Sequence, residues 1–242
     1  MSTDTPSPAP VPGRLIAPSL FVVALLYGGM VTLAGVLGAK QVALGPLAVE
    51  AGFFAFLLGA EQVVLGPLAV EAGIFAFLLL VVMSSAVAEL HGRAVADRLV
   101  RWGFLPLITA IFLTFIVLQL PTDEGMYEPA KEAFPVILGQ SWRLMAAGII
   151  AYGVSQSLNV LLFARLKSSM GRLVAVRAAI AGVLSQIVDT LIFITVAFYG
   201  VRPIADLMLG QMLAKIVLSI VFVPPLILLF VRFGRRLDHA PE

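Results

Sequence analysis

The sequence predicts an all-α membrane protein, built as a polytopic bundle of about six transmembrane helices. Two observations lead to this fold class. Hydrophobic residues make up 60% of the 242 residues and charged residues only 12%, whereas soluble domains carry roughly 25% charged residues. The apolar residues also gather in runs that can span a hydrocarbon core about 30 Å thick, which takes about 20 helical residues.

The chain divides into three parts. Residues 1–13 are rich in Pro, Ser and Thr and lack the basic start of a signal peptide, so we expect a disordered tail. Residues 14–236 are expected to form a single transmembrane domain, and residues 237–242 a C-terminal tail. Cys is absent, which excludes disulfides and Cys-ligated metals from the sequence given.

Six apolar runs make up the predicted transmembrane domain. In chain order they are residues 15–37, 75–90, 102–120, 142–163, 176–199 and 204–230. The second run needs help from the residues before it to reach spanning length. The third run is followed by Pro121 and an acidic segment through Pro135, which we expect to be a loop.

Basic residues orient this bundle, because Lys and Arg are enriched in cytoplasmic loops. Every second connection is basic. Arg14 precedes the first run, and the later clusters are Arg93, Arg98 and Arg101; Arg165, Lys167, Arg172 and Arg177; and Arg232, Arg235 and Arg236. The pattern predicts a multi-pass membrane protein with both termini cytoplasmic. Since the basic residues lie in short clusters between apolar runs, the net charge of +2 does not indicate a nucleic acid partner.

Residues 36–56 return almost unchanged as residues 57–77, a tandem duplication with a period of 21. The copies differ only at positions 36/57, 40/61, 43/64 and 53/74. An extra crossing here would place residues 93–101 outside, against the charge pattern. We therefore expect an excursion on the outer side, buried against protein if it is re-entrant. A recent duplication without a role is an equally open interpretation.

Polar residues inside the apolar runs are the candidate site, since ionisable groups at membrane depth are rare and face the bundle interior. The fourth run contains Ser155-Gln-Ser-Leu-Asn159 and the fifth contains Ser185-Gln-Ile-Val-Asp189. Residues three apart share a helix face, so Gln156 and Asn159 point one way, as do Gln186 and Asp189.

Asp189 and Lys215 are the most costly residues at this depth, and Gln211 lies one turn before the lysine. One interpretation is structural, with an Asp189–Lys215 ion pair and amides that only join helices. We favour a solute-binding cluster, because several amides and a charge pair at one depth exceed what helix association needs. A carboxylate and amides suit the donor and acceptor edges of a planar solute.

Glu89 closes the second run, close to the basic connection. Pairing with Arg93 at i, i+4 and direct contact with solute are the two interpretations of this acid. His91 and His239 are the only histidines in the sequence, so we expect no metal site. No cofactor is expected.

At these motifs the sequence resembles the queuosine precursor transporter family, also called the vitamin uptake transporter family. The family pattern is represented by Leu65-Gly-Pro67, by Glu89-Leu-His-Gly92, by Ser185-Gln-Ile-Val-Asp189, and by Lys215 with the Ile/Val-rich stretch after it. The motifs occur in the family's order over nearly the whole chain after the tail. Gln156 and Asn159 correspond to a Gln-x-x-Asp of the fourth span.

The resemblance implies a six-helix fold similar to the substrate-binding subunits of vitamin transporters, and uptake of 7-deazaguanine queuosine precursors. With it, the candidate substrate-binding residues are Glu89, Gln156, Asn159, Gln186, Asp189 and Lys215. Three positions depart from the family pattern: Ser85 and Asn159 stand where Asp is expected, and His91 replaces Tyr. These departures leave the exact solute open.

A transporter is therefore the leading prediction, with another vitamin or nucleobase as the alternative solute. An intramembrane enzyme using Glu89 and His91 is disfavoured because the sequence contains no H-E-x-x-H or G-x-S-x-G motif. A structural subunit is the third interpretation. No G-x-x-x-x-G-K-[ST] loop is present, so uptake would need a gradient, metabolic trapping or an external energising module. A homo-oligomer also stays open.

Overall fold

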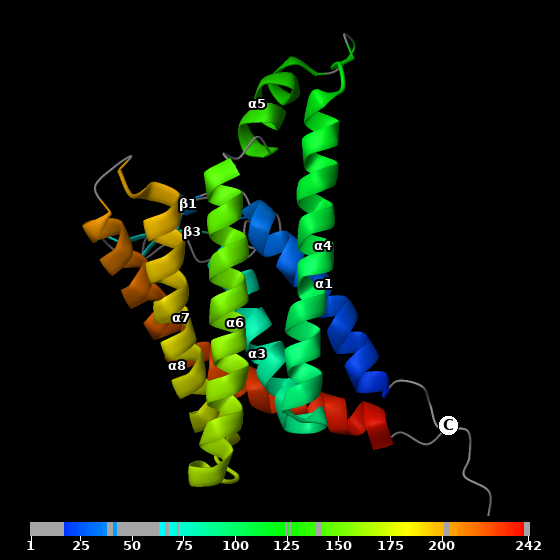
Figure 1. Ribbon diagram of the computed structural model, residues 1–242, viewed down its shortest axis with the longest axis vertical. Coiled ribbons are helices and arrows are strands. Elements are labelled where there is room, and N and C mark those ends of the chain that lie inside the picture. The colour runs from blue at the N-terminus through cyan, green and yellow to red at the C-terminus, as the bar shows by residue number, and fades with distance from the viewer. Residues whose placement is uncertain are drawn as a thin grey trace, which may run out of the picture.

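The computed structural model describes residues 17–37, 41–42, 63–65, 68–71, 73–123, 125, 127–138, 142–200 and 204–239. Six long helices form a bundle (Figure 1): α1 Pro18–Leu37, α3 Gly73–His91, α4 Arg93–Gln119, α6 Trp142–Met170, α7 Val174–Phe198 and α8 Ala205–His239. In the described part of the chain, five helices are long and apolar enough to cross a membrane, and α1 adds a shorter apolar stretch, Pro18–Thr32. The predicted six-helix membrane bundle is confirmed.

The segment after the third run differs from the expected loop, because Glu128–Leu138 forms the short helix α5. Its first residue is an acid, which interacts favourably with the amide dipoles at a helix start. Proline follows at the next position, where the missing N–H has no intrahelical partner anyway. Lys131 Nζ lies 2.6 Å from Glu128 Oε1, one turn away. These local contacts explain a helix where composition alone indicated a loop.

The duplicated region contributes three short antiparallel strands: β1 Gln41–Val42, β2 Val63–Leu65 and β3 Leu68–Glu71, in the order β1-β3-β2. Val42 and Val63, which are equivalent positions of the two copies, pair with Val70 from opposite sides. Residues 43–62 lie outside the described residues, so the re-entrant path expected for the duplicated region stays a prediction.

Helix α1 ends and helix α3 begins at the same end of the bundle. Ser19, at the start of α1, lies 2.8 Å from Nε2 of His91, at the end of α3. The two helices are therefore antiparallel, and the strands between them lie at the opposite end of the bundle. The Asp238 carboxylate joins the same corner, where it accepts hydrogen bonds from the Ser19 backbone N–H and hydroxyl. The end of α8 is thus held at the start of α1.

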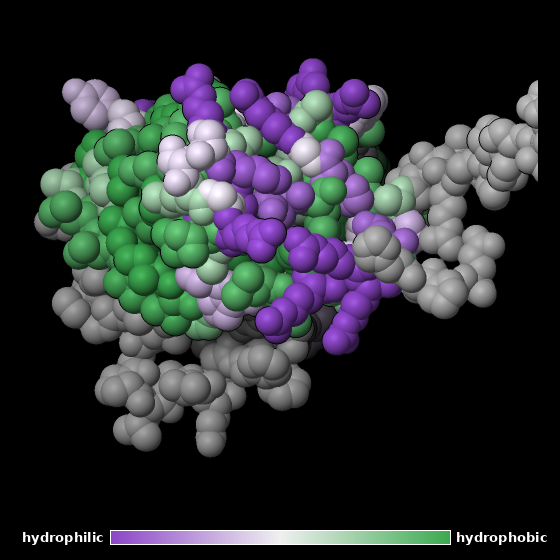
Figure 2. Space-filling model, turned by 90° about the horizontal axis from the view of Figure 1, so that it is seen from below, coloured by the Kyte–Doolittle hydropathy of each residue, from purple (hydrophilic) through white to green (hydrophobic). Residues whose placement is uncertain are grey.

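Among the described residues, the exposed Lys and Arg side chains lie at the end of the bundle at which α3 and α6 finish. They are Arg93, Arg98, Arg101, Arg165, Lys167, Arg172, Arg232, Arg235 and Arg236, and we call this surface the basic end. Figure 2 views the molecule from this side, where hydrophilic residues gather beside a large apolar flank. Two tight turns here, at Gly92 and Gly171, have positive φ angles of 86° and 51°, which glycine adopts without steric strain.

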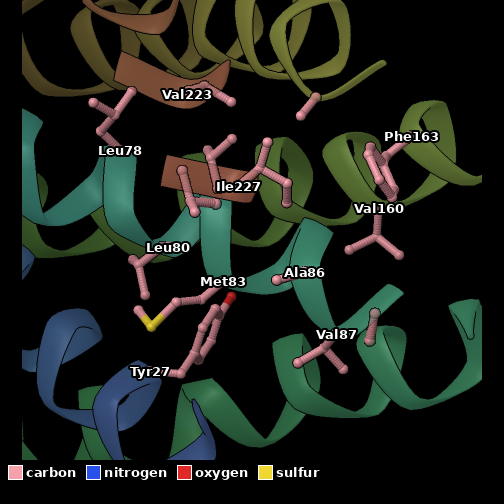
Figure 3. Packing of buried hydrophobic residues seen from close by; sticks show 14 of the residues in the cluster. Tyr27, Leu78, Leu80, Met83, Ala86, Val87, Val160, Phe163, Val223 and Ile227 are labelled. Carbon is pink, nitrogen blue, oxygen red and sulfur yellow. The ribbon is translucent and has the colours of Figure 1, made fainter. Parts of the chain in front are cut away.

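Helix α3 is the centre of the bundle and packs against α1, α4, α6, α7 and α8. Leu80, Val81 and Val82 are fully buried on successive sides of this helix. Figure 3 shows Leu80 and Met83 directed toward Tyr27 of α1. Helix α8 crosses the bundle obliquely (Figure 1) and contains Pro224 and Pro225, which deprive its middle of two backbone N–H donors.

Candidate functional site

The polar faces of four helices meet inside the bundle. Helix α3 contributes Ser84 and Ser85, and α6 and α7 contribute the two predicted Ser-Gln patterns. We call the following residues the central polar cluster: Ser84, Ser85, Ser155, Gln156, Asn159, Gln186, Asp189, Gln211, Lys215 and Ser219, all of which are buried. Five of the six predicted site residues belong to it, and Glu89 does not.

The two formal charges of the cluster pair with each other. Lys215 Nζ lies 2.7 Å from Asp189 Oδ2, and their side chains are only 8% and 6% exposed. The Ser155 hydroxyl donates to the other carboxylate oxygen, at 3.1 Å. The Lys215 ammonium also lies 5.7 Å from the centre of the Phe77 ring, within the range of a cation–π contact. The ion pair joins α7 to α8, and neither charge is left without a counter-ion.

Asn159 joins α6 to α3. Its Nδ2 group donates to the hydroxyls of Ser84 and Ser85, both at 3.0 Å, and to the Val81 carbonyl at 3.2 Å. The Ser84 hydroxyl donates in turn to Gln156 Oε1, at 3.2 Å. Ser85 and Asn159, the two positions where the sequence departs from an acidic family pattern, are therefore in direct contact. Both departures make this part of the cluster uncharged.

Seven polar atoms of the cluster have no hydrogen-bond partner among the described residues. They are Gln156 Nε2, Asn159 Oδ1, both amide atoms of Gln186, both amide atoms of Gln211, and Ser219 Oγ. Buried polar atoms in native proteins are nearly always bonded to protein or to ordered water. So many unpartnered donors and acceptors in one cluster indicate a place for a ligand or for water.

Sequence reasoning missed part of this cluster. Gln211, Lys215 and Ser219 are spaced by four, which places them on one face of α8. Gln211 was recognised one turn before Lys215 but was not assigned to the site, and the same spacing could have added Ser219. Phe77 could not have been found in this way. It lies in the wholly apolar first half of α3, and only the packing of α3 against α8 brings its ring to Lys215.

Glu89 lies in a second polar contact, nearer the basic end. Its carboxylate is 2.7 Å from Nη2 of Arg177 and 3.7 Å from Nζ of Lys167. The first of the two interpretations of Glu89, a pairing with Arg93, is wrong, because Arg93 pairs with Asp97 at 3.3 Å. Arg177 was expected in a loop; it lies in the first turn of α7, where its guanidinium is fully buried, 4.6 Å from the centre of the Phe163 ring.

His91 contacts Ser19 and lies 3.8 Å from the Asp238 carboxylate. Together with Glu89 it lines an open cavity of about 450 Å³ at the basic end, with Ala17, Leu90, Arg235 and Asp238. No group of three or more potential metal-ligating side chains occurs within the described residues. A Ser-His-Asp group is present here, but the Ser19 hydroxyl donates directly to Asp238, which is not the order that nucleophilic catalysis requires.

Comparison with known proteins agrees with this architecture. A family model described as "Putative vitamin uptake transporter" matches residues 71–229, which is more than half of the chain. A protein of Bacillus subtilis (strain 168) named "Probable queuosine precursor transporter" is 31% identical over 147 residues. That alignment covers 56% of this chain and 61% of the relative. No solved structure matches.

The match begins at residue 71 and includes every member of the central polar cluster, whereas the first copy of the duplication lies outside it. The family resemblance indicated by the ordered motifs is thereby confirmed. The chain belongs to the vitamin uptake transporter family, a family of membrane transporters and not of enzymes.

Proposed function

We propose that this protein imports a small planar solute, a 7-deazaguanine queuosine precursor, and binds it at the central polar cluster. The observation that carries the proposal is the set of seven unpartnered polar atoms enclosed by α3, α6, α7 and α8. Each such atom costs about 1–3 kcal/mol when it is left without a partner. A solute that bonds to several of them would remove this penalty on binding.

The chemistry of the cluster suits the edges of a deazaguanine ring. Such a ring presents N–H donors and a carbonyl acceptor in one plane. A glutamine amide carries a carbonyl and an NH₂ group side by side, and it can therefore bond to two adjacent ring atoms at once, as it does with an adenine edge in DNA. Gln186 and Gln211 have both amide atoms available for such contacts, and the Phe77 ring adds an aromatic surface.

The same proposal places the protein in the bacterial inner membrane with the basic end and both termini in the cytoplasm, following the enrichment of Lys and Arg in cytoplasmic loops. Glu89 and Arg177 then lie between the cluster and the cytoplasm. The B. subtilis relative's name supports the choice of queuosine precursors. The uncharged Ser85–Asn159 contact favours a second candidate, another nucleobase or vitamin, because a changed contact residue changes specificity.

Thermal stabilisation of the detergent-purified protein tests the proposal. Queuine, other 7-deazaguanines, guanine and unrelated vitamins are added separately. A ligand that binds only the folded state contributes about 2.7 kcal/mol at 100 times its Kd, so the melting temperature rises visibly. Stabilisation by 7-deazaguanines is expected. Stabilisation by another vitamin alone would show that this vitamin, and not a queuosine precursor, is the solute. No response to any compound would reject the site.

A matched pair of variants on α7 locates the binding. Gln186→Leu removes both amide atoms at nearly constant volume, and we expect it to abolish or strongly weaken the ligand-dependent shift. Leu191→Met changes an exposed apolar side chain on the same helix and should leave the shift unchanged. Equal shifts in the two variants would place the solute elsewhere.

A further inference from the structure

We propose that Gln211 and Ser219 of α8 contact the solute directly and that the part of the solute held in the central polar cluster is uncharged. Neither residue belongs to the site predicted from the sequence. The inference rests on the proposed function only in locating a solute at this cluster. It adds a recognition helix and a rule for the charge of the solute.

The position of α8 supports the first half. Lys215 reaches Asp189, so its face of α8 is directed into the cluster. Gln211 and Ser219 lie four residues before and after it, one helical turn to either side on the same face. Gln211 is 1% exposed and Ser219 is fully buried. A lipid-facing role is therefore excluded for both side chains.

The hydrogen bonds distinguish a side chain that joins two helices from one that is available to bind a solute. An amide that joins helices is bonded across the interface, as Asn159 is to Ser84 and Ser85. Gln211 makes no such bond: neither its NH₂ group nor its carbonyl has a partner among the described residues, and the Ser219 hydroxyl has none. These atoms hold no helix pair together, and they are available to a ligand.

The charges support the second half. The Asp189 carboxylate is occupied on both oxygens, by Lys215 and by Ser155. In the described residues, the next charges along α3 and α7 toward the basic end are the partly buried Glu89 and the buried Arg177, and they pair with each other. A charged solute group would therefore enter a buried site without a free counter-ion, which is strongly unfavourable. The unpartnered atoms of the cluster are all uncharged donors and acceptors, which suit a neutral group; the unpartnered Nε and Nη1 of Arg177 lie outside the cluster.

Pairs of ligands that differ only in charge test this rule. The first pair is 7-cyano-7-deazaguanine, which is neutral, and 7-aminomethyl-7-deazaguanine, which is a cation at pH 7. The second is nicotinamide, which is neutral, and nicotinate, which is an anion. Binding constants are measured by titration calorimetry on purified protein. We expect the neutral member of a bound pair to bind at least tenfold more tightly. Tighter binding of a charged member overturns the rule.

Variants of Gln211 test the contact. Gln211→Leu removes the amide, and the Kd of the neutral ligand should rise by about tenfold or more, as expected for the loss of a hydrogen bond to a buried group. Gln211→Glu places a carboxylate there, and preference should shift toward the aminomethyl cation. Leu209→Met, at an exposed position of α8, is the matched control. An unchanged Kd in both Gln211 variants would overturn the assignment, and the melting temperature without ligand shows whether each variant is folded.

The outcomes distinguish this inference from the proposed function. If the wild-type protein binds no 7-deazaguanine but binds nicotinamide at least tenfold more tightly than nicotinate, the proposed solute is wrong and the rule for charge is upheld. If it binds the aminomethyl cation more tightly than the cyano compound, the proposed function is upheld and the rule is wrong. Binding of none of the four compounds overturns both.

Discussion

Replacing Lys215 with methionine leaves the Asp189 carboxylate buried beside an apolar side chain, and replacing Asp189 with asparagine leaves the ammonium in the same position. The two groups are 2.7 Å apart and less than a tenth exposed. At an effective dielectric constant of about 20, Coulomb attraction at this distance is about 6 kcal/mol. Desolvation of both ions opposes this attraction in the intact pair.

The free energies of unfolding should therefore follow a definite pattern. Each single variant leaves one uncompensated charge, which is expected to lower stability by about 3–5 kcal/mol. The double variant Asp189→Asn/Lys215→Met contains no buried charge, so it should lose far less than the sum of the single losses. The coupling energy between the two sites should be about 3 kcal/mol, at the upper end of the range for residues in contact.

Unfolding by SDS, followed by circular dichroism in mixed micelles, measures these differences. Leu213→Met, at an exposed position of α8, is the control and should unfold like the wild-type protein. Additive losses in the double variant, or single losses below about 1 kcal/mol, would show that the pair is not formed. Uptake of the solute by Asp189→Asn should be lost while the protein still inserts, and wild-type uptake in that variant would remove Asp189 from the site.

Three further predictions concern other parts of the bundle. Arg177→Met should lower the free energy of unfolding by about 1–3 kcal/mol because it leaves the partly buried Glu89 carboxylate with only the more distant Lys167, and adding Glu89→Gln should restore most of it in the same SDS titration. Gly103→Ala should cost about 1–3 kcal/mol in that titration, since its Cβ would collide with a buried tyrosine hydroxyl, whereas Gly148→Ala has open space. Deletion of residues 36–56 should leave ligand-induced stabilisation unchanged, because the second copy supplies β2, β3 and the start of α3.

Each of these has a result that would contradict it. If the free energy of unfolding is not restored in the Arg177→Met/Glu89→Gln double variant, the two side chains do not pair. Equal stability of Gly103→Ala and Gly148→Ala would show that α4 does not pack closely against α6 at Gly103. Loss of ligand-induced stabilisation on deletion would give the first copy a role that the second cannot take over.

Helix positions follow from the sequence because the bilayer imposes a length on apolar runs. The predicted run 176–199 and the observed α7 Val174–Phe198 differ by two residues at the start and one at the end. The predicted lengths are too short for helices that continue into polar residues beyond the apolar run. Helix α6 continues to Met170 and α8 to His239, because backbone hydrogen bonds extend a helix past the membrane edge, where hydropathy gives no indication of its end.

By itself the sequence determined which residues face inward on each helix, since helical spacing is local: Gln156 with Asn159, and Gln186 with Asp189. The tertiary structure alone decided which of these faces meet. Arg177 pairs with Glu89, 88 residues away, and not with a neighbour in its own segment. Phe77 reaches Lys215 only because α3 packs against α8. A buried polar group needs a hydrogen-bond or charge partner. In a bundle, the contacts between helices decide which partner lies within reach.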